Sequence, residues 1–100
     1  MTDAQPETVS ADEARDIRRR QLRYRSWKRG TKEMDLLMGN FADAYLDGFS
    51  DEELDQFEWL LRENDPDLYN WFVGVSQPPA DYENPMLARF LAFDYKPDPR

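Results

Sequence analysis

The sequence predicts an all-α protein folded as a small five-helix bundle in a single domain. Apolar residues recur with a spacing of three or four in five segments, and capping or turn residues separate those segments. No segment shows the strict alternation of a half-buried strand. The chain has 100 residues, of which 40% are hydrophobic, which is enough for one modest core and too little for a second.

The first helix is predicted over residues 11–29. Ser10 is its expected N-cap, and Glu13 stands three residues later, where it completes a capping box. The apolar face that we expect to join the core is made of three residues, Ile17, Tyr24 and Trp27. Arginines occupy most of the remaining circumference.

The second helix is predicted to end near Leu46, before Gly48. Gly30 supplies a left-handed turn after the first helix, and Thr31 is the N-cap of the second. The apolar stripe of this helix consists of Met34, Leu37, Met38, Phe41, Ala42 and Tyr45. Gly39 lies inside the helix at a cost of about 1 kcal/mol relative to alanine. It therefore indicates either close packing or a local bend.

Two shorter helices follow, each with its own start signal. Ser50 and Glu53 form a second predicted capping box. The helix after it has the apolar stripe Leu54, Phe57, Leu60 and Leu61. In the next helix Asp65 is the expected N-cap, Pro66 lies in the first turn and Gly74 stands just past the end. That helix carries Leu68, Trp71 and Phe72.

The last predicted helix follows a proline-rich loop, residues 77–85. It carries Met86, Leu87, Phe90 and Leu91. We expect the helical domain to span residues 11–94. Residues 1–10 are polar, contain a proline and lack periodicity, so we expect a disordered lead-in there and a flexible tail over residues 95–100.

The composition excludes most catalytic chemistry. The chain has no cysteine and no histidine, which removes disulfides, thiolate and imidazole metal ligands, and nucleophiles that depend on histidine. We therefore expect a protein that is not an enzyme, with no catalytic residues and no metal site. No apolar run approaches the roughly 20 residues of a membrane-spanning helix, so no membrane insertion is expected.

The acidic clusters are better explained by solvation and helix capping than by chemistry. An acid/base pair requires burial or neighbouring groups that separate the pKa values of two carboxylates. The expected positions of Asp51, Glu52 and Glu53 are capping and solvent-facing ones, which do not provide such a separation. The DPD stretch, residues 65–67, lacks the glycine and the terminal glutamate of a calcium loop.

The basic residues are concentrated in one segment. Nine of the 13 Lys and Arg residues lie in residues 15–32, where Asp16 is the only acid, so this segment carries +8 and the other 82 residues sum to −16. Such a dipolar protein is expected to bind an acidic partner. The alternative is a small nucleic-acid-binding protein, because RRRQLRYRSWKRG interleaves basic and aromatic residues. The overall charge and the expected burial of Tyr24 and Trp27 argue against that alternative.

KRGTKEMD, residues 28–35, forms the corner between the first two helices. The requirements of helix structure alone explain these residues. Arg29 offsets the dipole at the end of the first helix, Gly30 supplies the turn, and Glu33 lies in the first turn of the second helix. Each of the two charges contributes about 0.3–1 kcal/mol. A binding function fits the same residues. A glycine corner has no side chain, so a partner's backbone can approach closely between Arg29 and Glu33.

Two motifs together resemble a known family. KRGTKEMD contains the signature RGxxE, and ENDPDLYNWFVG, residues 63–74, places Asp65 36 residues after Arg29. This ordered pair is similar to the succinate dehydrogenase flavoprotein assembly factors, called SdhE in bacteria, over about residues 15–92. The resemblance implies a helical assembly factor that binds the flavoprotein subunit of succinate dehydrogenase, and in some bacteria that of fumarate reductase. It also implies that the protein promotes covalent FAD attachment.

The resemblance extends to the site, the cofactor and the location. The partner-binding residues that it implies are Lys28, Arg29, Gly30, Lys32, Glu33 and Asp67. FAD is then the cofactor of the partner, this chain binds none stably, and we expect a monomer. The arginine-rich first helix resembles alphaproteobacterial and mitochondrial members, and the acidic start favours the bacterial cytoplasm. A helical adaptor whose partner is unrelated to flavin is a third alternative.

Overall fold

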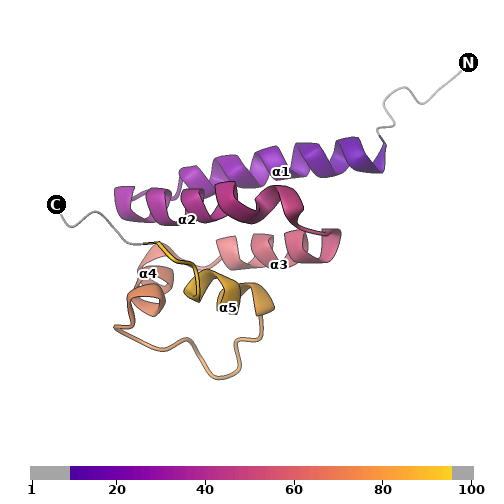
Figure 1. Ribbon diagram of the computed structural model, residues 1–100. Helices are drawn as coiled ribbons and strands as arrows, with labels where there is room; N and C mark the ends of the chain where they lie inside the picture. The colour runs from indigo at the N-terminus through magenta and orange to yellow at the C-terminus, as the bar shows by residue number, and fades with distance from the viewer. Residues whose placement is uncertain (1–9, 96–100) are drawn as a thin grey trace, which may run out of the picture.

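The computed structural model describes residues 10–95, which contain five α-helices and one 3₁₀ turn (Figure 1). They are α1 (Ala11–Trp27), α2 (Lys32–Tyr45), η1 (Leu46–Gly48), α3 (Asp51–Leu61), α4 (Asp65–Val73) and α5 (Pro85–Leu91). No strand occurs in this part of the chain, so the predicted all-α, five-helix bundle is confirmed. None of the described helices is long and apolar enough to cross a membrane. The expected lead-in and tail lie, apart from residues 10 and 95, outside the described residues.

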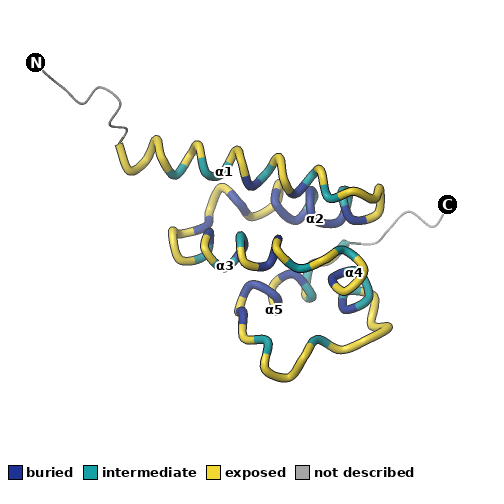
Figure 2. Tube along the Cα trace, turned by 180° about the vertical axis from the view of Figure 1, so that it is seen from behind, coloured by how far each residue is buried: buried dark blue, intermediate teal, exposed yellow. Residues whose placement is uncertain are grey.

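The helices are arranged as two pairs with α3 between them (Figures 1 and 2). α1 and α2 run antiparallel and make the most extensive helix-to-helix contact. α3 packs against α1 on one side and against α5 on the other, and α4 and α5 contact each other. The corner between α1 and α2 therefore lies at one end of the first pair, on the same end of the molecule as α4 (Figure 1).

The core is built around α2, which is buried along one face. The first five predicted apolar residues of α2 are at most 1% exposed. The Phe41 ring lies at the centre of an aromatic cluster, with its centroid 5.9 Å from that of Phe57 and 5.6 Å from that of Phe90. Tyr45 differs from expectation and is exposed, because α2 ends there and the chain turns into η1. Leu91 in α5 is only partly buried.

Most of the predicted helix starts are confirmed. The capping boxes of α1 and α3 are both complete, and the Thr31 side chain accepts a hydrogen bond in the first turn of α2. The expectation for α4 is wrong by one residue: Asn64 is the N-cap, and its side chain accepts from the Asp67 N–H at 3.0 Å. The Asp65 carboxylate is thereby left available for another contact. α5 begins at Pro85, which we expected to end the preceding loop.

The inward face of α1 differs from the one predicted. Ile17 and Tyr24 are exposed, Tyr24 to 66%, whereas Leu22 and Ser26 are buried. The helix also ends at Trp27 and not at residue 29. The residues that face the bundle one turn and two turns before Leu22 are arginines, Arg19 and Arg15, whose side chains are 17% and 27% exposed. A search for apolar residues alone therefore selects the wrong face, and most of α1 is solvent-exposed (Figure 2).

Gly39 allows α1 and α2 to pack closely. The indole ring of Trp27 lies directly over it, and a Cβ atom at this position would clash with three ring carbons. Gly39 is buried within a continuous helix. Close packing is therefore the reason for this glycine, and Trp27 is covered by α2 on one side of its ring.

Candidate functional site

The corner of residues 28–31 joins α1 to α2, and its residues Lys28, Gly30 and Thr31 are exposed. Gly30 has φ +122°, so the predicted need for a positive φ is confirmed. A Cβ atom on Gly30 would have one neighbour within 4 Å, Asp65 Oδ2 at 3.9 Å. The surface at Gly30 is therefore open, and another chain can approach its backbone.

Asp35 holds this corner in place from within α2. Its Oδ1 accepts hydrogen bonds from the backbone N–H groups of Arg29 at 2.5 Å and Gly30 at 3.2 Å. Both N–H groups follow the end of α1, so Asp35 fixes the path of the chain between the helices. Sequence reasoning missed this role, although an aspartate in the first turn after a glycine corner is well placed to reach back to it.

Arg29 is directed into the protein. Its Nε donates to Asp65 Oδ1 at 2.8 Å, and its two terminal nitrogens donate to the backbone oxygens of Leu61 and Glu63, each at 2.7 Å. The side chain is only 9% exposed. It satisfies carbonyls at the end of α3, not at the end of its own helix, and so ties the corner to the turn between α3 and α4.

The other predicted site residues lie at the surface. Lys28, Lys32, Glu33 and Asp67 are all exposed, and none takes part in an ion pair within residues 10–95. Lys28 places its ammonium 6.0 Å from the centre of the Tyr24 ring. The structure thus divides the predicted set into one inward-facing arginine and five positions that another protein can reach.

A surface pocket of about 310 Å³ brings the two sequence motifs together. It is lined by Thr31, Glu33, Met34, Asp65, Pro66 and Tyr69. The first three come from the corner and the start of α2, and the others from the start of α4. Sequence reasoning assigned Met34 to the core and did not single out Tyr69, because nothing local shows that these two helix starts adjoin.

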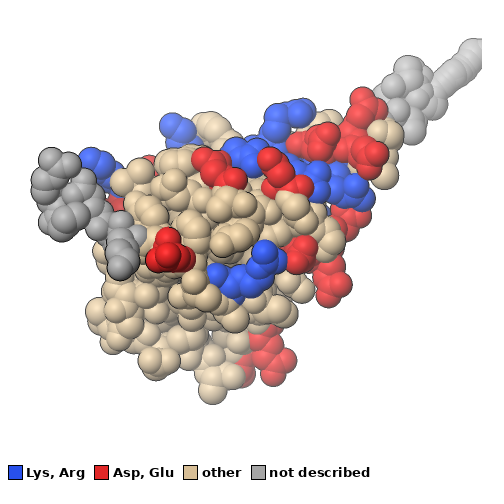
Figure 3. All heavy atoms as spheres, viewed as in Figure 1, with Lys and Arg blue, Asp and Glu red and all other residues tan. Residues whose placement is uncertain are grey.

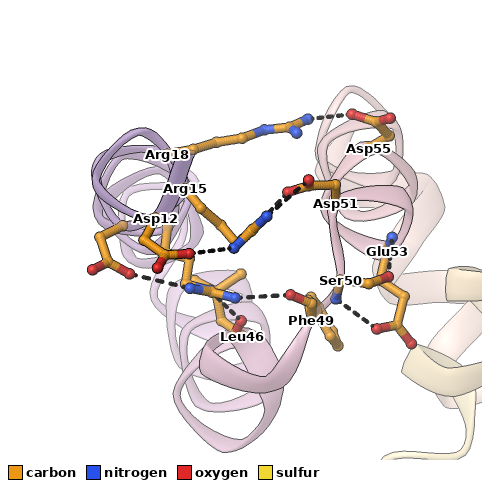
Figure 4. Close-up of polar contacts among 11 residues, drawn as sticks. Asp12, Arg15, Arg18, Leu46, Phe49, Ser50, Asp51, Glu53 and Asp55 are labelled. Carbon is orange, nitrogen blue, oxygen red and sulfur yellow. Dashed lines mark hydrogen bonds and ion pairs between the residues drawn. The ribbon is translucent and has the colours of Figure 1, made fainter. Parts of the chain in front are cut away.

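The arginines of α1 bind carboxylates of the same molecule. Arg15 contacts Asp51 through two hydrogen bonds of 2.7 and 3.0 Å, and Arg18 contacts Asp55 at 2.7 Å (Figure 4). Arg23 contacts acids at the end of α2 and in η1. Basic and acidic side chains are consequently interleaved along α1 and its neighbours (Figure 3).

These contacts bear on the nucleic-acid alternative. A phosphate would have to displace carboxylates that already bind most of the arginines, and the acids would repel it. The expected burial of Tyr24 was wrong and does not count against that alternative. The ion pairs of the α1 arginines, and not the position of Tyr24, argue against nucleic-acid binding.

Curated proteins similar to this chain are named as assembly factors. Succinate dehydrogenase assembly factor 2 of Debaryomyces hansenii, a mitochondrial protein, is 42% identical over 82% of this chain and 60% of its own length. The corresponding protein 2-B of Drosophila ananassae is 40% identical over 79% of this chain and 50% of its own length. The FAD assembly factor SdhE of Acetobacter pasteurianus is 40% identical over 74% of this chain and 68% of its own length. The chain thus spans only one half to two thirds of these relatives.

The expected bacterial cytoplasmic location is wrong on this comparison. The relatives from Debaryomyces, Drosophila, Scheffersomyces and Dictyostelium are all named as mitochondrial, although a bacterial protein also matches. The expectation depended on acidic residues near the start, and that feature is too local to set the protein apart from mitochondrial relatives.

A family model agrees with the two motifs. The model described as the flavinator of succinate dehydrogenase matches residues 20–94, from the middle of α1 past the end of α5. This span includes the corner, the pocket and the whole of α4. The resemblance inferred from RGxxE and DPDLYNW is confirmed, and the chain belongs to the family of flavinators of succinate dehydrogenase.

Proposed function

We propose that this protein binds the flavoprotein subunit of succinate dehydrogenase and promotes covalent attachment of FAD to it. The observation that carries the proposal is the open corner at Gly30 beside the exposed Glu33, at the meeting point of the two motifs. The names of the relatives support it, because they describe assembly factors for succinate dehydrogenase and for FAD. The described helical part of the chain is proposed to carry this activity.

The proposed contact surface follows from the exposure of each residue. Gly30 lets the partner approach, and the proposed contacts come from four exposed charged side chains: Lys28, Lys32, Glu33 and Asp67. Arg29 belongs to the site as the residue that holds the corner against α4. Its guanidinium is already bound to three acceptors, so we assign it a positioning role.

The proposed mechanism is a shift of population in the partner. Covalent flavinylation joins a flavoprotein histidine to the FAD ring, and this chain has neither histidine nor cysteine to offer as a nucleophile. No cluster of three or more potential metal ligands occurs among the described residues. The chain would act by binding more tightly to the flavoprotein conformation in which the histidine and FAD are aligned. FAD then remains the cofactor of the partner.

Two further features of the proposal concern the partners. The flavoprotein of fumarate reductase is proposed as a second partner, because it carries the same cofactor. We also propose that the protein acts as a monomer and leaves when the iron–sulfur subunit takes its place, since a factor that remained bound would block assembly. Size-exclusion chromatography with light scattering tests these points, on the protein alone, on its mixture with each flavoprotein, and on each mixture after addition of the iron–sulfur subunit.

In-gel fluorescence of the denatured succinate dehydrogenase flavoprotein tests the main proposal. Denaturation removes non-covalent FAD, so the remaining signal reports the covalent bond. We expect the signal to fall when the gene is deleted, to return with wild type, and to stay low with Glu33→Ala. The structural contribution of Glu33 is a first-turn dipole interaction of about 1 kcal/mol or less, so the variant should remain folded. Undiminished fluorescence without the gene would refute the proposal.

A further inference from the structure

The pocket between the starts of α2 and α4 has apolar walls. Met34, Pro66 and Tyr69 are three of its six lining residues, and Thr31, at the N-cap of α2, is a fourth. Its volume of about 310 Å³ is at the lower end of the roughly 300–1,000 Å³ of pockets that enclose whole small ligands. These dimensions suit one long side chain of a partner.

The pocket has one carboxylate that no basic residue neutralises. Two acids line it, Glu33 and Asp65, and no basic residue does. Asp65 is neutralised by the Nε of Arg29, whose other nitrogens are bound to backbone oxygens outside the pocket. Glu33 is exposed and makes no ion pair or side-chain hydrogen bond within residues 10–95. The pocket thus combines apolar walls with one free negative charge.

We propose that this pocket receives a single basic side chain, lysine or arginine, from the flavoprotein, and the inference rests on the function proposed above. A basic side chain has an apolar stem and a charged end, which match the walls and Glu33 respectively. Its charge would also lie near the Tyr69 ring, whose face attracts cations. An acidic side chain would be repelled, and an apolar one would leave Glu33 without a partner.

The position of Gly30 supports the same occupant. Gly30 lies beside Asp65 at the edge of the pocket, with open space where a side chain would stand. A partner's backbone can therefore lie against the corner while one of its side chains enters the pocket. The glycine would set how closely the partner approaches, and the pocket would select which residue it presents.

The chain contains a matched control for Glu33. Glu33 is the second residue of α2, and Glu52 is the second residue of α3, and both are exposed. Replacement by glutamine removes the same charge from the same place in a helix, so dipole effects and the change in net charge are equal. Only Glu33 lines the pocket.

Titration of the purified flavoprotein subunit with wild type, Glu33→Gln and Glu52→Gln, at low and physiological salt, tests the inference. We expect Glu33→Gln to bind about tenfold more weakly, with a reduced dependence on salt, and Glu52→Gln to match wild type. Binding by wild type with equal affinities for the two variants would overturn the pocket inference and leave the proposed function standing. Failure of wild type to bind would overturn the proposed function itself.

Alanine replacement of the lysines and arginines on the flavoprotein surface then tests for the occupant. We expect one basic residue whose loss weakens binding to wild type about tenfold and has little added effect on binding to Glu33→Gln. A scan in which every replacement weakens binding to both proteins equally would overturn the assignment of a basic side chain.

Discussion

Arg29 connects two turns of the chain that lie 32 to 36 residues apart in sequence. Its planar guanidinium is suited to this position, because it donates to a carboxylate and two carbonyls at once. Asp35 performs the complementary role for the backbone of the same corner. The geometry of the proposed site is therefore fixed by two residues that a partner need not touch.

Replacement of Arg29 by alanine should destabilise the fold strongly. The change leaves Asp65, whose side chain is 14% exposed, without its partner, and we expect the free energy of unfolding to fall by about 3–5 kcal/mol. Urea denaturation followed by circular dichroism measures it. Arg20→Ala is the control, since Arg20 is exposed and makes no ion pair within residues 10–95, and it should change the value by less than about 0.5 kcal/mol. Similar losses for both variants would contradict the assigned role.

A comparison of two variants at Gly30 should separate the effect of backbone strain from the effect of steric exclusion of the partner. Alanine and arginine at this position both carry the strain of a positive φ, about 1–3 kcal/mol, and the Cβ atom that they share would meet only Asp65 Oδ2, at 3.9 Å. We expect Gly30→Ala and Gly30→Arg to melt at similar temperatures, whereas only Gly30→Arg should abolish flavinylation. In-gel flavin fluorescence and thermal circular dichroism measure the two effects. If both variants flavinylate the partner equally, Gly30 is not in the interface.

At the scale of the elements, local signals were predictable and long-range contacts were not. The capping boxes of α1 and α3 and the stripe of α2 depend on residues within a few positions of each other, so sequence pattern was enough. The inward face of α1 depends on acids in α3, such as Asp51, which lies 36 residues from Arg15. The corner was predictable from Gly30, but its pocket required the packing of α4 beside α2.

Gly39→Ala should show that α1 docks on α2 through a close approach. Alanine favours a helix by about 1 kcal/mol over glycine, but its Cβ would clash with the Trp27 ring, and overpacking costs about 1–3 kcal/mol or more. We expect a lower melting temperature and altered tryptophan fluorescence. Gly48→Ala is the control, because a Cβ there meets nothing within 4 Å, and its stability should be unchanged or slightly raised. A stabilised Gly39→Ala would contradict the packing described.

On the scale of the whole molecule, the charge asymmetry of the sequence is largely cancelled by folding. The basic α1 lies against acids of α2, η1 and α3, so its positive charge is not displayed as one surface (Figure 3). The net charge of the whole sequence is −8. The net charge of each segment could be calculated from the sequence. The pairing of the arginines of α1 with acids of other helices could not be predicted, because it depends on which helices pack together.

Acid should weaken the fold through the contacts of α3. The hydrogen bond from Arg15 holds the pKa of Asp51 below its usual 3.8, and the Ser50 backbone N–H holds the pKa of Glu53 below 4.5. Both groups therefore stabilise the fold above these values, and the contribution is lost as the pH falls through and below them. We expect the melting temperature to decrease from pH 5 to pH 3, and to decrease less in Asp51→Asn. Asp81→Asn, in an exposed loop, should follow wild type. Identical curves for all three proteins would contradict this account.

The contact between Arg29 and Asp65 has a consequence for how this protein can evolve. Because of this contact, the RGxxE and DPDLYNW motifs are expected to change together. Replacement of Arg29 or of Asp65 alone would leave the other residue with a poorly solvated, unpaired charge. Drift should therefore be slow at both positions and coupled between them, while the exposed Lys28 and Lys32 are free to change with the surface of the partner. Lineages that lose the aspartate are expected to have lost the arginine as well.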